Sequence, residues 1–206
     1  MKRIFACSVL LLALGAPLTA LAAPPQAAPV AALDTGLLAS MRAGSAGQDS
    51  QARNAALAPV VQSSFNLPVV TQNSVGFLWS TLPAAQQQRL IQLLGQFTVA
   101  SYVAEFSSYQ GEKFKLLPAE KTLGSKKIIE TQLIPAGGTP TELDYVVANG
   151  PHGWQITDVL LNGTISQVAV HASDFSGLVN DGDASSLINA LQAKIVSLSS
   201  PSGAGN

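Results

Sequence analysis

The chain is poor in cysteine and in charge, and each shortage narrows the chemistry open to it. Its only cysteine is Cys7, which lies in a segment that we predict to be removed, so neither a disulfide nor a cysteine nucleophile is expected in the mature chain. Only 11% of the residues are charged, against about a quarter in typical soluble domains. The mean hydropathy is positive, at +0.29. The sequence therefore predicts either an extensive core or an apolar cavity whose lining adds to it.

Signatures of catalysis and of metal binding are also missing. The sequence contains no G-x-S-x-G motif, no glycine-rich phosphate loop and no H-E-x-x-H motif, which are short patterns of hydrolases, nucleotide-binding proteins and zinc enzymes. His152 and His171 are the only histidines, and their separation of nineteen residues matches no metal-ligand spacing. We therefore expect two surface histidines, no metal site and no cofactor.

The first residues have the organisation of a secretory signal peptide. Lys2 and Arg3 precede an apolar stretch at 4–14, and small residues follow at 20–22, as at a signal-peptide cleavage site. We predict a signal peptide at 1–22, whose removal would leave 206 − 22 = 184 residues. No later stretch has the ~18 uninterrupted apolar residues that a membrane-spanning helix needs. The mature protein is therefore expected to be exported, without a membrane span.

The charge balance argues against nucleic acid as a partner. Without Lys2 and Arg3 the formal charge changes from 11 − 12 = −1 to 9 − 12 = −3, whereas nucleic-acid-binding domains are basic. The remaining bases are unevenly spread, because five of the nine fall within fifteen residues: Lys113, Lys115, Lys121, Lys126 and Lys127. This lysine cluster is either a solvated strand edge, where lysine discourages edge pairing, or a patch that faces a docking partner or a lipid headgroup.

The first half of the chain has helical periodicity. The sequence predicts two alanine-rich helices within 33–61, a short helix over 68–76 and a long helix over 83–109. Gly95, inside the long helix, indicates close packing against a neighbour. Apolar residues recur along the long helix at spacings of three and four: Leu90, Ile91, Leu94, Phe97, Val99, Tyr102, Val103 and Phe106.

After Gly111 the period becomes alternating. Five strands separated by short turns predict an antiparallel meander, and they lie at 113–117, 125–134, 141–148, 153–161 and 164–171. Two closing helices follow, a short one capped by Asp174 and a longer one over 184–198. Helices, then a sheet, then helices indicate an α+β fold. The predicted organisation is an Ala/Pro linker (23–32), one domain (33–199) with helical (33–110), sheet (111–171) and closing-helix (172–199) parts, and a flexible tail (200–206).

Asp158 is the one serious catalytic candidate. A carboxyl group between apolar residues, near tyrosines such as Tyr102 or Tyr145, could serve as a general base with a raised pKa. The other interpretation is structural: Asp158 accepts hydrogen bonds from backbone amides beside the Asn162-Gly163 turn, a dipeptide typical of tight hairpins. No second acid or histidine has a recognisable position beside Asp158, so we favour the structural role.

Six segments, in register over about 150 residues, resemble the MlaC family of periplasmic lipid-binding transport proteins. They are FNLPVVTQNSVGFLW, LPAAQQQRLIQLLGQF, YVAEFSSYQGEKF, DYVV, GWQITDVLLNGTISQVAV and DFSGLVNDGDASSLINALQAK. Within the family, Tyr-Val-Ala-x-Phe at 102–106 and Asp-Val-Leu-Leu-x-Gly-Thr-Ile-Ser at 158–166 are most similar to the branch associated with hopanoid biosynthesis.

The resemblance implies a lipid carrier rather than an enzyme. It implies a twisted antiparallel sheet forming a cone, wrapped by the long helix and by N- and C-terminal helices, an NTF2-like arrangement with helical additions. It also implies a monomer in the periplasm that carries a phospholipid or a hopanoid between an inner-membrane ABC-type transport complex and an outer-membrane partner. The alternative is a cone-fold enzyme that acts on a hydrophobic cyclic substrate with Asp158 as general base.

A carrier of this kind needs an apolar cavity between the sheet and the long helix. The residues expected to line it are apolar or aromatic and belong to the long helix or to strands of the predicted sheet. They are Phe97, Val103, Phe106, Ile129, Leu133, Leu143, Tyr145, Val147, Trp154 and Ile156.

Overall fold

The structure is a computed structural model that describes residues 24–200. The predicted signal peptide (1–22) and residues 201–206 of the predicted tail lie outside the described residues. Within the described residues, one five-stranded antiparallel sheet, six α-helices and two short 3-10 helices make up the fold, which confirms the α+β class. Among residues 24–200, none of the helices combines the length with the apolar character that a membrane span requires.

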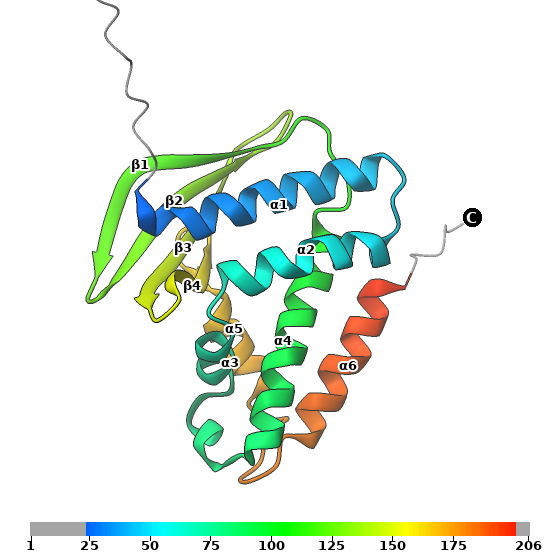
Figure 1. The fold of residues 1–206 in the computed structure, drawn as a ribbon, viewed down its shortest axis with the longest axis vertical. Coiled ribbons are helices and arrows are strands. Elements are labelled where there is room, and N and C mark those ends of the chain that lie inside the picture. Colours follow the sequence, from blue (N-terminus) through cyan, green and yellow to red (C-terminus); the bar gives the residue numbers. More distant parts are fainter. Residues whose placement is uncertain (1–23, 201–206) are drawn as a thin grey trace, which may run out of the picture.

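The helices and the sheet are contiguous blocks in the sequence (Figure 1). The first block is helical: η1 (Pro25–Ala27), α1 (Ala28–Ser45), α2 (Ser50–Ser64), α3 (Leu67–Val75), η2 (Gly76–Thr81) and α4 (Ala84–Glu105). The sheet and the last two helices follow: β1 (Lys113–Leu123), β2 (Lys126–Ile134), β3 (Thr141–Gly150), β4 (Gly153–Leu161), β5 (Ile165–Ser166), α5 (Gln167–Phe175) and α6 (Ser185–Ser199).

The sheet is a meander in the order β1-β2-β3-β4-β5. The β1–β2 register shifts between Leu116 and Glu120, and the β3–β4 register shifts between Val146 and Val147. Pro118 lies within the first irregularity, on an edge strand, where the lack of a backbone N–H costs no ladder bond. Such irregularities bend a strand, and β1 bends sharply in Figure 1.

The predicted linker at 23–32 is wrong, because most of it is helical. Residues 25–27 form η1 and α1 begins at Ala28. Prolines lie in the first turn of each helix, where the missing N–H is not needed, and alanine is the best helix former. Ala27 and Val30 have no exposed surface, since this segment packs against β2, β3 and β4. Alanine and proline therefore begin a buried helix here.

The predicted strand at 164–171 is also wrong, so the sheet ends at Ser166 and not at residue 171. Within the predicted strand, only Ile165 and Ser166 pair with β4, and α5 begins directly afterwards. The side chain of Ser166 accepts a hydrogen bond from the backbone N–H of Ala169 at 3.0 Å, which makes it an N-cap. Asp174, the predicted cap, lies in the last turn of α5.

The long helix α4 packs against both α2 and α6, and the three helices are visible together in Figure 1. Gly95 lies at the crossing of α4 with α3, where a Cβ atom would come within 2.9 Å of Cδ1 of Leu67. This distance is shorter than ordinary van der Waals contact. The close packing predicted for Gly95 is thus confirmed.

Arg53 connects three helices. It lies on α2, is 5% exposed, and donates through Nε to the carbonyl of Ser40 on α1 at 2.9 Å. Its Nη2 donates to the carbonyls of Val103 and Phe106, at the C-terminal end of α4, at 3.0 and 2.6 Å. The last carbonyls of a helix lack partners within the helix and carry partial negative charge, so a cation there is stabilising.

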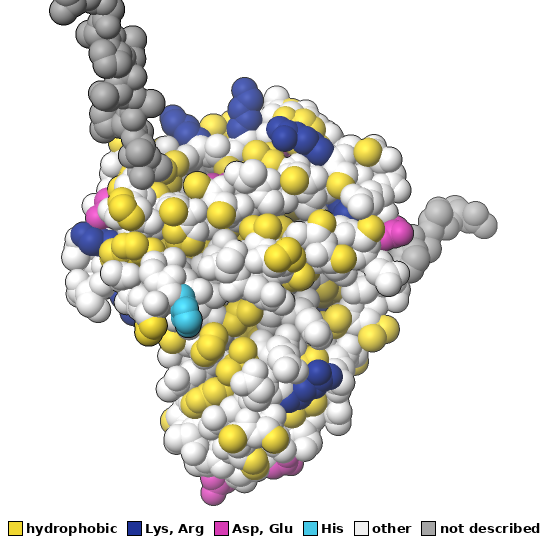
Figure 2. All heavy atoms as spheres, in the orientation of Figure 1, with side chains coloured by type: hydrophobic (Ala, Val, Ile, Leu, Met, Phe, Trp, Pro, Cys, Tyr) yellow, Lys and Arg dark blue, Asp and Glu magenta, His cyan; other side chains and the backbone are white. Residues whose placement is uncertain are grey.

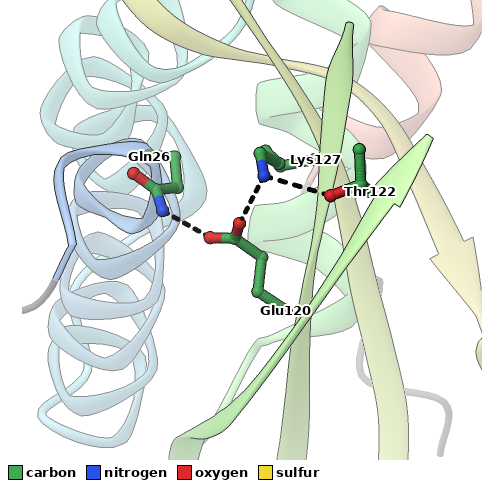
Figure 3. A network of polar contacts seen from close by, with 4 residues as sticks. All are labelled: Gln26, Glu120, Thr122 and Lys127. Carbon is green, nitrogen blue, oxygen red and sulfur yellow. Dashed lines mark hydrogen bonds and ion pairs between the residues drawn. The ribbon is translucent and has the colours of Figure 1, made fainter. Parts of the chain in front are cut away.

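Two side chains of the lysine cluster form ion pairs with glutamates. Lys127 pairs with Glu120 at 2.9 Å and Lys121 pairs with Glu130, all on β1 and β2. Glu120 also accepts a hydrogen bond from Gln26 of η1, and Lys127 donates to Thr122 at 3.1 Å. Figure 3 shows this network linking the start of the helical layer to the β1–β2 pair. Part of the cluster therefore stabilises the fold locally.

Replacement of Arg53 tests its role. In Arg53→Met the three carbonyls lose their donor while the aliphatic part of the side chain is retained, so we expect the free energy of unfolding to fall by about 3 kcal/mol. Arg42→Met is the matched control, because Arg42 is exposed and stacks on Tyr109, a contact worth under about 1 kcal/mol. Urea denaturation measures both values. Equal losses in the two variants would contradict the role of Arg53.

Candidate functional site

A cavity of about 630 Å³ lies between α4 and the sheet. Its volume is within the range of small-molecule sites, roughly 300–1,000 Å³. Helices α1, α3, α4 and α5, strands β2, β3 and β4, and the α2–α3 junction contribute to its wall. Apolar and aromatic side chains form much of it: Leu37, Phe65, Val70, Leu94, Phe97, Tyr102, Phe106, Leu133, Leu143, Tyr145, Val159, Leu161 and Val168.

Five of the ten predicted lining residues are on this wall. They are Phe97, Phe106, Leu133, Leu143 and Tyr145. The other five pack in the core instead: Val103, Ile129, Val147 and Ile156 are buried, and Trp154 is partly buried against the same core. Val147 pairs with Ile156 across β3 and β4, and η1 packs against these strands. The sheet extends beyond the cavity to where η1 covers it. The same face of a strand therefore lines the cavity at some residues and packs in the core at others.

An aromatic row extends along the wall. The ring of Tyr102 lies 6.4 Å from that of Phe65 and 6.1 Å from that of Phe106, and Phe106 lies 6.0 Å from Phe114. These centroid distances are in the range of favourable aromatic pairs. Tyr102 and Leu94 belong to the apolar pattern of the long helix, so the sequence did indicate that they face the wall. No pattern in the sequence indicated Phe65, because it follows α2 in an extended conformation and pairs with β4.

His171 lines the cavity, so the prediction of a surface histidine is wrong for it. Its ring stacks on Phe175 at 5.4 Å and meets the edge of Phe97 at 5.7 Å. Burial lowers the pKa of its imidazole. The error follows from the misassigned strand, because α5 turns this residue toward α4. His152, in the β3–β4 turn, is exposed as predicted.

Asp158 is a backbone anchor, as the structural interpretation predicts. Its Oδ1 accepts hydrogen bonds from the backbone N–H of Val159 at 2.8 Å and of Val168 at 3.1 Å. Its Oδ2 accepts from the hydroxyl of Ser166 at 2.5 Å. These bonds attach the first turn of α5 to β4. Nearby, Asn162 and Gly163 have φ values of 52° and 71°, which confirms the predicted tight turn.

Asp34 is a buried carboxyl group on the helix that contributes Leu37 to the cavity wall. It lies on α1, is 8% exposed, and its Oδ1 has no hydrogen-bond partner within residues 24–200. Burial raises the pKa of this carboxyl from 3.8 to about 7. The pKa values of the phenols of Tyr102 and Tyr145 are raised by burial and, second, by the charge of Asp34. Little in the sequence points to Asp34, because it lies in an alanine-rich helix whose apolar periodicity is weak.

A second, smaller groove of about 440 Å³ lies on the opposite side of α4, between α2 and α6. Its wall combines small residues such as Ala55, Ala58 and Gly95 with amides such as Gln92 and Gln96. Figure 2 faces this side of the molecule, where hydrophobic side chains show between polar ones. Among the residues that the structure describes, no cluster of histidine, cysteine, aspartate or glutamate is arranged to hold a metal ion.

The raised pKa of Asp34 predicts a pH-dependent stability. The folded state keeps a proton that the unfolded state releases between its ordinary pKa of 3.8 and about 7, so Asp34 makes the fold less stable as the pH rises through this window, by about 4 kcal/mol at most. Asp34→Asn removes this titration. The difference in free energy of unfolding, wild type minus variant, should fall from pH 4 to pH 7 in urea titrations. A pH-independent difference for Asp34→Asn would contradict the assignment.

Comparisons with known proteins agree with this architecture. The solved structure of a phospholipid-binding protein from Ralstonia solanacearum, in complex with a phospholipid, is similar with a TM-score of 0.72 and 19% sequence identity, over 86% of this chain and 100% of that chain. A search of curated proteins gives no match. The sequence pattern of the family described as MlaC protein matches residues 32–193. The chain belongs to the MlaC family.

Proposed function

We propose that this chain is a periplasmic lipid carrier that holds the apolar part of a lipid in the cavity between α4 and the sheet. The observation that carries the proposal is the cavity itself, whose wall is mostly apolar and whose elements come from the whole length of the domain. The fold is shared with a protein described as bound to a phospholipid, and the family is the same as that indicated by the sequence.

The energetics of lipid transfer favour an enclosed apolar wall. Each buried methylene contributes about 0.8 kcal/mol, so two sixteen-carbon chains represent roughly 20 kcal/mol or more. Contacts with a headgroup alone do not offset such a cost in water. The wall supplies several aromatic side chains, including Phe97, Tyr102 and Phe106, which bury large apolar areas.

The finer parts of the proposal follow from the resemblance in sequence. The carrier would take a phospholipid or a hopanoid from one membrane to the other, loading or unloading at an inner-membrane ABC-type transport complex and at an outer-membrane partner. Exposed lysines are available for docking on an acidic surface: Lys113 and Lys115 lie exposed on β1, close in sequence to Phe114, whose ring contacts the cavity residue Phe106.

Binding is favoured over catalysis at Asp158. Both carboxylate oxygens already accept hydrogen bonds from within the chain. A general base must be within hydrogen-bond reach of a substrate proton, and the oxygens of Asp158 are engaged by Val159, Ser166 and Val168. The cone-fold enzyme remains the alternative function, since Asp158 does belong to the cavity wall.

Filling the cavity should displace the lipid. Ser101 lies on the wall and Ala104, on the same helix, is exposed and away from it. We expect wild-type protein and Ala104→Trp to carry co-purified lipid in native mass spectrometry, and Ser101→Trp to carry at least tenfold less, because the indole occupies the space of the ligand. Wild-type protein that retains no lipid and takes none up from phospholipid vesicles would refute the carrier function.

Replacement of Asp158 separates the two functions. Asp158→Asn should lower the free energy of unfolding by about 1–2 kcal/mol, because the bonds of the anchor are weakened, while the folded variant keeps its lipid. If the protein is a carrier, a bacterial lipid extract incubated with the wild type or with Asp158→Asn should show no new product in mass spectrometry. A product that forms with the wild type and not with Asp158→Asn would favour the enzyme.

A further inference from the structure

The turn between β1 and β2 is an exposed protrusion that the cavity does not explain. We call residues 121–127, with the sequence KTLGSKK, the hairpin tip. Leu123 in the tip is 54% exposed, and Gly124 makes the turn with a φ of 60°. A Cβ atom at Gly124 would meet nothing within 4 Å, so the turn is surrounded by open space. In Figure 1 the β1–β2 pair extends beyond the helices on the left.

The strand register places Leu123 and two lysines on the outward face of this hairpin. Leu123 pairs with Lys126, and Lys121 pairs with Ile128. Residues that are directly opposite in an antiparallel pair share a face, as do residues two apart along one strand. Lys121, Leu123 and Lys126 therefore lie on one face. Ile129, on the other face, is 3% exposed in the core, so the face with Leu123 points away from the core.

Positive charge is concentrated in the hairpin tip. The tip contains three lysines and no acid, whereas the other residues of the mature chain contain 9 − 3 = 6 basic and 12 acidic side chains. A negatively charged surface would therefore attract the tip and repel the rest of the molecule, which fixes the orientation of the protein on that surface.

The ion pairs of the hairpin leave its lysines able to bind other anions. Glu120 and Glu130, which pair with Lys127 and Lys121, lie outside the tip, toward the base of the hairpin. Partly exposed ion pairs of this kind are weak, so their lysines can exchange a glutamate for a phosphate. Among residues 24–200, Lys126 forms no ion pair.

The size of the tip favours a lipid bilayer over an acidic protein as its partner. A stable protein interface buries roughly 800 Å² on each side and depends on aromatic or arginine anchors, but the tip has seven residues, none of them aromatic or arginine. A bilayer surface requires less. One leucine can enter the boundary between headgroups and chains, while lysines bury their aliphatic stems and keep their ammonium groups level with the phosphates.

We propose that the hairpin tip is a contact site for an anionic lipid bilayer, with Leu123 entering the interface and Lys121, Lys126 and Lys127 contacting lipid phosphates. The contact is reversible, because a single short apolar anchor binds a membrane only weakly. It goes beyond the proposed carrier function, since the residues of the tip are not on the cavity wall. The tip would hold the protein at a membrane surface whether or not the cavity is loaded.

Vesicle sedimentation tests the proposal. The mature chain, residues 23–206, is mixed with vesicles of phosphatidylcholine alone or of equal parts phosphatidylcholine and phosphatidylglycerol. We expect binding to the anionic vesicles to be about tenfold tighter at low ionic strength, and this preference to be lost in concentrated salt. Lys126→Gln and Leu123→Ser should each weaken binding to the anionic vesicles by about fivefold.

Two substitutions on α6 are matched controls. Lys194→Gln and Val196→Ser make the same changes of charge and apolar surface at exposed positions, and they should leave vesicle binding unchanged. Cooperative urea unfolding shows that each variant is folded, and native mass spectrometry should find the same cargo in both tip variants as in the wild type. Unchanged vesicle binding in the tip variants, or an equal loss in the α6 variants, would overturn the proposal.

A fluorescent label reports directly on insertion. The predicted mature chain has no cysteine, so Leu123→Cys can be labelled with an environment-sensitive nitrobenzoxadiazole. Its emission should shift to the blue on anionic vesicles, and the emission of labelled Val196→Cys should not. A label at 123 that stays in water would overturn the insertion of the tip. Wild-type protein that carries lipid but binds no vesicles would overturn the tip contact alone, whereas vesicle binding without any cargo would refute only the carrier function.

Discussion

The arrangement of the cavity depends on one buried cation. Arg53 on α2 donates to carbonyls of α1 and of the C-terminal end of α4, and it has no carboxylate partner among the described residues. The carbonyls that it binds on α4 belong to Val103 and Phe106, next to and within the aromatic row that lines the cavity. The hydrogen bonds from Arg53 that satisfy the C-terminal carbonyls of α4 thus also hold this end of the cavity wall in place.

Hydrogen bonds at the ends of other helices and strands position the remaining wall. Asp158 attaches the start of α5 to β4, which places Val168 and His171 on the wall. The backbone N–H of Asn66 donates to the carbonyl of Ile156 at 2.9 Å, which holds the α2–α3 junction and Phe65 against the sheet. Polar groups at the ends of elements therefore determine the shape of a space that is itself mostly apolar.

The sequence predicted the fold class and the order of the elements because periodicity reports on which faces are buried. It misplaced α5 because QVAVHA alternates like a strand. Ser166 instead caps a helix through the backbone N–H of Ala169, and its hydroxyl is held by Asp158 of β4, a tertiary contact that the sequence does not show. It missed the start of α1 because alanine and proline read equally as a linker and as a helical first turn. Burial of Ala27 and Val30 against the sheet is not visible in composition.

The candidate site was only half predictable for a related reason. Leu143, Tyr145 and Val147 are equivalent by alternation, but the first two border a cavity and the third is in solid core. Whether a buried face meets space or another side chain depends on how far η1 and α1 cover the sheet. Asp34 was missed because a single acid in an alanine-rich helix resembles any solvated residue until its burial is known.

The two hollows on either side of α4 share that helix as a common partition. An α-helix with its side chains is about 10–12 Å across, and Gln96 is exposed on the groove side while Phe97 and Thr98 border the cavity. A fluorophore attached at Gln96 would sit about one helix diameter from the cargo without entering its space. Under the proposed carrier function, this position would let the loading and unloading of the cavity be followed optically in real time.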